Sequence, residues 1–164
     1  MLREISAGGV VLQEREGAWW MAVIEPAEEA PKAGDPVPRA HRVPKPVYAL
    51  PKGLVDPGEK ALETALREVH EETGVIAEAV AKLGDIKYIY TRTWGGGERV
   101  FKIVSFYLMR YVSGRIDDVA REMRIEVARA SWIQLEEAPK LLAYRGEKQM
   151  ARKALEYVGK HPEL

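Results

Sequence analysis

The spacing between apolar residues along this 164-residue chain changes several times, and each change predicts a new helix or strand. Runs rich in β-branched residues predict strands, whereas apolar residues spaced three and four apart predict helices. Strands are expected at 5–12, 19–24, 47–50, 75–83, 86–93, 100–111 and 130–135. Helices are expected from the turn at 56–59 up to Gly74, and at 136–142 and 147–158. Periodicity alone therefore predicts a fold that combines α-helices and β-strands.

A proline-rich segment at about 25–46 interrupts this pattern, because it holds six of the ten prolines. Proline excludes a helix or a central strand there, so the segment is either a mobile loop or a functional flap. Arg39, His41, Arg42 and Lys45 in its second half are candidate contacts for a polyphosphate, with ordinary surface packing as the alternative. The length otherwise suits a single domain over 1–164 that buries about 70% of its unfolded surface.

Composition excludes several classes of function. Lys and Arg together number 25, as do Asp and Glu, so the net charge of zero predicts neither a nucleic-acid groove nor an anionic membrane surface. The absence of cysteine excludes thiol catalysis and a disulfide framework. The start of the chain does not resemble a signal peptide, and the run at 18–24 is too short to cross a bilayer, so we expect a cytoplasmic enzyme.

The helix predicted before Gly74 carries an unusual density of carboxylates. Leu62, Ala65, Leu66 and Val69 form a buried stripe on one side. Glu68, Glu71 and Glu72 fall within about 100° of one another on another side, where they could converge on one point. Like charges at this spacing destabilise a helix unless a cation binds. Oxygen ligands without His or Cys favour Mg²⁺ over zinc, with Mn²⁺ as an alternative.

Arg67 lies among these acids and has several possible partners. Its charged guanidinium could hold the start of the helix by binding Glu59 or Glu63, or it could face a phosphate.

The same stretch fits the pattern Gx5Ex7REUxEExGU, where U is aliphatic, at every fixed position. The matching residues are Gly53, Glu59, Arg67, Glu68, Val69, Glu71, Glu72, Gly74 and Val75. This pattern is the Nudix box, and the chain resembles Nudix hydrolases. SAGGVVL at 6–12, YALPKG at 48–53 and WIQLEEA at 132–138 resemble other segments of that family. The resemblance implies an α/β/α sandwich, with a mixed curved sheet flanked by the box helix on one face and the C-terminal helices on the other.

The resemblance also implies an active site. Mg²⁺ would bind Glu68, Glu72 and the Gly53 carbonyl, with Glu71 as a further ligand, while Glu71 or Glu126 would act as general base. Arg67 and Glu59 complete the catalytic group as a supporting pair. The implied reaction is hydrolysis of a phosphoanhydride in a compound that contains a nucleoside diphosphate.

Candidate substrate contacts come mainly from aromatic and basic residues. Tyr90 lies sixteen residues after Gly74, a position where a tyrosine is typical of the diadenosine tetraphosphate branch; a half-buried strand tyrosine is the alternative. The full set is Lys52, Tyr88, Tyr90, Arg92, Trp94 and Tyr144.

Dinucleoside polyphosphates are therefore the expected small-molecule substrates. The alternatives are an RNA 5′ end, ADP-ribose or a nucleotide sugar, and a diphosphoinositol polyphosphate. A non-catalytic nucleotide-binding module is the alternative from a different class. The sequence leaves the oligomeric state open.

Overall fold

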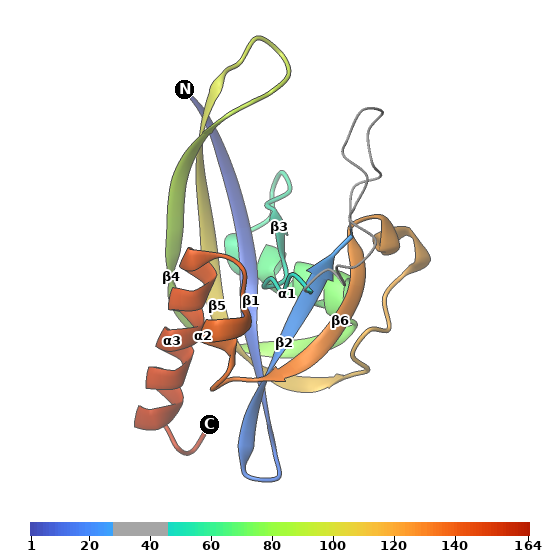
Figure 1. Cartoon of the computed structure of the whole chain (residues 1–164), viewed down its shortest axis with the longest axis vertical. Coiled ribbons are helices and arrows are strands. Elements are labelled where there is room, and N and C mark those ends of the chain that lie inside the picture. Colours follow the sequence, from blue (N-terminus) through green and yellow to red (C-terminus); the bar gives the residue numbers. More distant parts are fainter. Residues whose placement is uncertain (28–45) are drawn as a thin grey trace, which may run out of the picture.

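The predicted strands assemble into one mixed sheet of six strands with helices on both sides (Figure 1). The structure is a computed structural model that describes residues 1–27 and 46–164. Its elements are β1 (Leu2–Arg15), β2 (Ala18–Pro26), β3 (Lys52–Leu54), α1 (Ala61–Thr73), β4 (Val75–Thr91), β5 (Arg99–Gly114), the 3₁₀ helix η1 (Arg121–Ile125), β6 (Val127–Gln134), α2 (Ala138–Leu141) and α3 (Arg145–Lys160).

Strand β1 is the centre of the sheet, whose order is β4-β5-β1-β2-β6 with β3 also paired to β1. One edge of β1 runs parallel to β5. The other edge is shared between two antiparallel partners, because Leu12 pairs with Met21 of β2 whereas Ser6 pairs with Leu54 of β3. The sheet therefore divides where β2 leaves β1 and the segment before β3 arrives.

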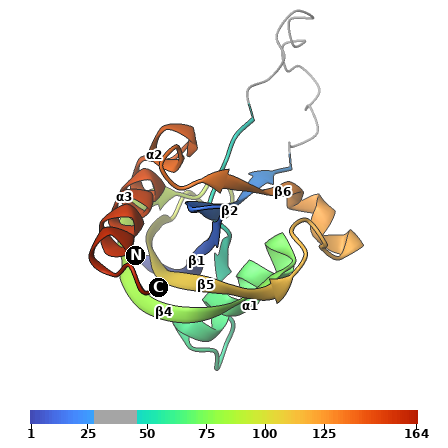
Figure 2. The same cartoon turned by 90° about the horizontal axis from the view of Figure 1, so that it is seen from below.

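Alternation along β1 directs its side chains to two cores. Val10 and Leu12 pack in a cluster with Met150 of α3. Ala7 and Val11 pack in a second cluster with Val69 of α1. Because neighbouring residues of a strand face opposite sides, α1 and α3 cover opposite faces. Figure 2 shows the sheet curving between them, which confirms the predicted mixed curved sheet of the α/β/α sandwich.

The box helix ends as predicted but begins later. Gly74 adopts a left-handed conformation with φ of 83°, and its amide donates to the His70 carbonyl, so it terminates α1. The helix starts at Ala61, after the Pro57-Gly58 turn. Glu59, which the expected helix included at its start, therefore precedes the observed helix.

Two strand predictions are also corrected. The segments 75–83 and 86–93 form the single strand β4, which absorbs three register shifts between Ile76 and Gly84. The expected strand at 47–50 forms only isolated bridges at Tyr48 and Ala49, and the ladder starts at Lys52. Two features interrupt it: the Leu50 amide donates to a side chain instead of a strand, and Pro51 has no amide hydrogen.

Most of the proline-rich segment, residues 28–45, lies outside the described residues, and so do the four candidate phosphate contacts Arg39, His41, Arg42 and Lys45. In the part of the chain that the structure describes, no helix has the length and hydrophobicity needed to cross a bilayer.

Candidate active site

Arg67 of α1 joins the turn before the helix to the carboxylates on the helix. Its Nε and Nη2 donate to the two oxygens of Glu59 at 2.8 and 2.9 Å. Nη1 donates to Glu68 at 2.9 Å and to Glu71 at 3.1 Å. These bonds lower the pKa of Glu59 to about 2, mainly through Arg67, and raise the pKa of Arg67, mainly through Glu59. Of the partners considered for Arg67, the structure selects Glu59 and leaves Glu63 exposed.

Glu68 and Glu72 are buried beneath the strand that carries Gly53. Their residues are 8% and 5% exposed. Glu72 accepts a hydrogen bond from the Lys52 amide at 3.0 Å. Burial, more than any other cause, raises the pKa of Glu68, and it raises that of Glu72 to about 8; neighbouring carboxylates act in the same direction. A charged Glu72 is therefore costly in the protein without a cation.

Gly53 allows this strand to lie against the acids. A Cβ at position 53 would stand 2.2 Å from the Glu68 Oε1 atom, so no larger residue fits without displacing that carboxylate. Glu68 thus lies against the backbone of Gly53 and Glu72 against that of Lys52, so this part of the site offers hard oxygen donors, the two carboxylates and backbone carbonyls. This donor set fits Mg²⁺ or Mn²⁺.

The expected convergence of three carboxylates is not found. Glu71 instead turns to Arg67 and is 39% exposed at its side chain. Among residues 1–27 and 46–164, no three acidic or histidine side chains form a group that could enclose an ion. The three carboxylates have different partners: Arg67 Nη1 binds Glu68 and Glu71, whereas the Lys52 amide binds Glu72.

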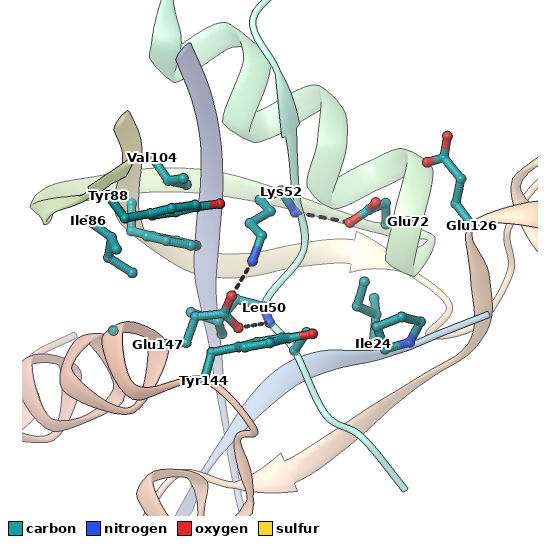
Figure 3. A pocket seen from close by; sticks show the side chains of 14 residues that line it. Ile24, Leu50, Lys52, Glu72, Ile86, Tyr88, Val104, Glu126, Tyr144 and Glu147 are labelled. Carbon is teal, nitrogen blue, oxygen red and sulfur yellow. Dashed lines mark hydrogen bonds and ion pairs between the residues drawn. The ribbon is translucent and has the colours of Figure 1, made fainter. Parts of the chain in front are cut away.

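Next to the acids lies a pocket of about 620 Å³. Its acidic end is formed by Glu72 from α1 and Glu126 from the end of η1 (Figure 3). Its other end carries Tyr88 of β4 and Tyr144 at the start of α3, with Lys52 between the two ends. The remaining lining is mainly apolar, from Ile24, Pro26, Ala49, Leu50, Ile86, Val104 and Phe106. The pocket has the size of a ligand site and combines an aromatic end with an acidic one.

The structure brings only half of the expected substrate contacts to this pocket. Lys52, Tyr88 and Tyr144 line it. The Tyr90 hydroxyl instead donates to Glu4 at 2.8 Å, outside the pocket lining. Arg92 and Trp94 lie further along the hairpin, and the Arg92 guanidinium stands 5.8 Å from the centroid of the Trp94 ring. The placement of these three residues thus differs from the expectation.

The two candidate bases differ in their placement. Glu126 lines the pocket, whereas Glu71 does not. The Glu126 carbonyl accepts a hydrogen bond from Ala27, which links the end of η1 to the end of β2. The pocket therefore receives acids from two separate elements.

Glu147 of α3 is a pocket residue that the sequence did not indicate. It is 2% exposed, its Oε1 accepts from the Leu50 amide at 2.6 Å, and its Oε2 pairs with the Lys52 ammonium. An acid in the first turn of a helix is ordinary, so its sequence position carried no signal. Its role depends on a partner 95 residues away.

These features define an α/β/α sandwich protein with a cleft that is aromatic at one end and acidic at the other. Residues 4–154 match the model of the NUDIX domain. The chain belongs to the Nudix family.

The known proteins that this chain resembles belong to the same family but carry names of different activities. The chain is 36% identical over 159 residues to a putative mutator protein MutT4 of Mycobacterium tuberculosis, covering 97% of this chain and 57% of that protein. It is 30% identical over 105 residues to an RNA pyrophosphohydrolase of Erythrobacter litoralis, covering 58% of this chain and 63% of the relative. The chain thus spans somewhat over half the length of these relatives. A C. elegans Ap4A hydrolase structure matches with a TM-score of 0.65 and 21% identity, covering 96% of this chain and 98% of that one, which shows the same fold.

Proposed function

We propose that the protein is a Mg²⁺-dependent pyrophosphohydrolase that cleaves a phosphoanhydride bond in nucleoside diphosphate-linked compounds, with dinucleoside polyphosphates as preferred substrates. The observation that carries this proposal is the pocket that joins Tyr88 and Tyr144 to Glu72 and Glu126. A nucleobase fits the aromatic end, and a phosphate chain would extend from there toward the acids.

The acidic end is where the divalent cation would bind, held by Glu68, Glu72 and the Gly53 carbonyl. When bound, Mg²⁺ neutralises phosphate charge and acidifies water. Arg67 supports this end by holding Glu68 in place, and Glu59 in turn orients both oxygens toward Arg67. Arg67 and Glu59 are therefore positioning residues in this proposal.

The chain's own groups account for the remaining steps. Tyr88 and Tyr144 stack on the base, which is worth about 1–3 kcal/mol per stacked base. The Lys52 ammonium donates to the nucleotide next to that base. Glu126 takes a proton on its carboxylate from the water that attacks phosphorus, while the bridging oxygen leaves with the departing phosphate group. Glu126 is preferred to Glu71 as general base because it lines the pocket.

The order of the aromatic and acidic ends along the pocket indicates which class of substrate fits. The phosphate chain leads away from the hairpin tip, so Arg92 and Trp94 have no part in this mechanism. A second nucleoside would leave on the side of Glu126. The aromatic end favours a substrate with a base over a diphosphoinositol polyphosphate, which has none.

Chromatographic analysis of products from a substrate panel tests the proposal. Diadenosine polyphosphates, ADP-ribose, nucleoside triphosphates, 5′-triphosphate RNA and diphosphoinositol polyphosphate would be incubated with Mg²⁺, with Mn²⁺ and with EDTA. Metal-dependent release of ATP with AMP or ADP from the diadenosine compounds, faster than turnover of the others, is the expected result. Preference for RNA 5′ ends, the activity named for one relative, would overturn the substrate assignment only. No turnover of any compound would favour a non-catalytic nucleotide-binding module.

A further inference from the structure

The Glu147 carboxylate is fully engaged by one short segment, Leu50–Lys52. One oxygen accepts from the Leu50 amide at 2.6 Å and the other binds the Lys52 ammonium. Pro51 between them has no amide hydrogen to offer. A single buried side chain from α3 therefore fixes a segment that belongs to neither α3 nor its neighbours in sequence.

Lys52 connects Glu147 to the acidic end of the pocket. Its amide donates to Glu72 at 3.0 Å, and its ammonium lies 5.3 Å from the centroid of the Tyr144 ring. Figure 3 shows the Lys52 side chain directed from the Glu72 side toward Glu147, between the rings of Tyr88 and Tyr144. The backbone of this residue thus contacts one end of the pocket and its side chain contacts the other.

The pair is unexpected on grounds of stability alone. Glu147 is 2% exposed whereas the Lys52 side chain is 30% exposed, and an ion pair to a buried carboxylate is seldom better than apolar residues of similar size. The nearby pocket wall of Ile86, Val104 and Phe106 is apolar. A lysine stem is flexible, so without Glu147 the ammonium could turn toward the carboxylates of Glu72 and Glu126. There it would compete with a cation for Glu72. The observed ion pair with Glu147 instead places the ammonium at the aromatic end.

We propose that Glu147 is a positioning residue that acts through Lys52: it holds the ammonium at the aromatic end of the pocket, where the ammonium binds the nucleotide. The inference rests on the proposed function for the identity of the ligand. It assigns Glu147 no contact with substrate. Its effect on nucleotide binding therefore depends on the presence of Lys52.

A double-mutant cycle tests this dependence. The wild-type chain, Glu147→Gln, Lys52→Gln and the double variant would be compared by kcat and KM for a diadenosine polyphosphate with Mg²⁺. Equilibrium binding of ADP in EDTA, measured by calorimetry, gives a readout that needs neither metal nor turnover. Glu156→Gln is the matched control, since it makes the same change on the same helix at an exposed ion pair.

Each single pocket variant is expected to raise KM and the ADP Kd about tenfold, the loss typical of a charge-assisted hydrogen bond, with a much smaller change in kcat. The double variant should bind no more weakly than Lys52→Gln, and Glu156→Gln should match the wild type. Multiplicative losses in the double variant would mean that Glu147 acts on the substrate or the fold directly, which overturns the inference.

Two further outcomes would also overturn it. The first is a fall in kcat and thermal stability with KM unchanged, which marks a structural role. The second is unfolding of both Glu147→Gln and the double variant. The double variant has two neutral amides that can still hydrogen-bond to each other, so its unfolding would mark a structural role for Glu147. Failure of the proposed function is a distinct result, in which the wild type binds ADP but hydrolyses none of the compounds. In that case the ADP affinities of the four proteins still decide the role of Glu147. A wild-type chain that does not bind ADP contradicts both.

Discussion

Replacing Glu72 by glutamine is expected to stabilise the metal-free protein at alkaline pH. Burial raises the pKa of this carboxyl in the folded state to about 8, above the ordinary value of 4.5. Between these two values the unfolded chain has released a proton that the folded chain still holds. The free energy of unfolding therefore falls as pH rises through this window, is highest below it and is level above it. Glutamine has no proton to lose and keeps an oxygen for the Lys52 amide.

The magnitude follows from the separation of the two pKa values. At about 1.4 kcal/mol per pH unit, titration from 4.5 to about 8 corresponds to a loss of up to roughly 5 kcal/mol, of which about 3.5 kcal/mol falls between pH 5 and 8. The raised pKa of Glu68 adds a change of the same sign. Glu59, whose pKa is lowered to about 2, acts below this range and does not interfere. A change of this size is a large part of the stability of an ordinary domain.

Urea unfolding in EDTA at pH 5 and pH 8 measures the effect. The wild type should lose several kcal/mol between the two, and Glu72→Gln should lose much less and be the more stable protein at pH 8. Glu71→Gln is the matched control, because it makes the same change at the next position on a side chain that is 39% exposed. An equal fall in Glu72→Gln and wild type, or an equal gain in Glu71→Gln, would refute the reasoning. Added Mg²⁺ should stabilise the wild type more at pH 8 than at pH 5, because it binds the ionised form.

Three other predictions concern single side chains. Glu126→Gln should lower kcat about 100-fold or more with little change in KM, measured by steady-state hydrolysis; near-full kcat would exclude Glu126 as the base. Tyr144→Ala should raise KM about 5- to 150-fold through lost stacking while Tyr144→Phe keeps it, and equal KM values for the two would contradict stacking. Gly74→Ala should lower the free energy of unfolding by more than about 1 kcal/mol. Its φ of 83° disfavours a side chain, and a Cβ would stand 2.4 Å from the Arg115 carbonyl; urea unfolding with wild-type stability would refute this.

The sequence by itself determined the features that are local. The turn at 57–58, the apolar stripe and Gly74 define the box helix to within two residues of its observed start. The pairing of Arg67 with Glu59 was among the expected contacts, because a turn followed by two helical turns brings these positions together. The hairpin of β4 and β5 also followed from the period of apolar residues. These features depend on spacing along the chain, which a sequence displays directly.

Only the tertiary structure decided which side chains meet in the pocket. Tyr88 and Tyr90 lie on the same strand with their ring centroids 6.2 Å apart, but only Tyr88 lines the pocket, beside Tyr144, while Tyr90 is held by Glu4 from β1. Three register shifts in β4 separate Gly74 from these tyrosines, so counting residues could not give the face they point to.

The acids show the same limit. Helical spacing allowed Glu68, Glu71 and Glu72 to converge, but Arg67 binds Glu68 and Glu71 while the Lys52 amide binds Glu72. Glu147 gained its partners because α3 packs beside a segment 95 residues earlier in the chain. Contacts of that kind depend on how the layers of the sandwich close on one another. The pattern of a sequence specifies which face of an element is buried, but not which distant side chain that face will meet.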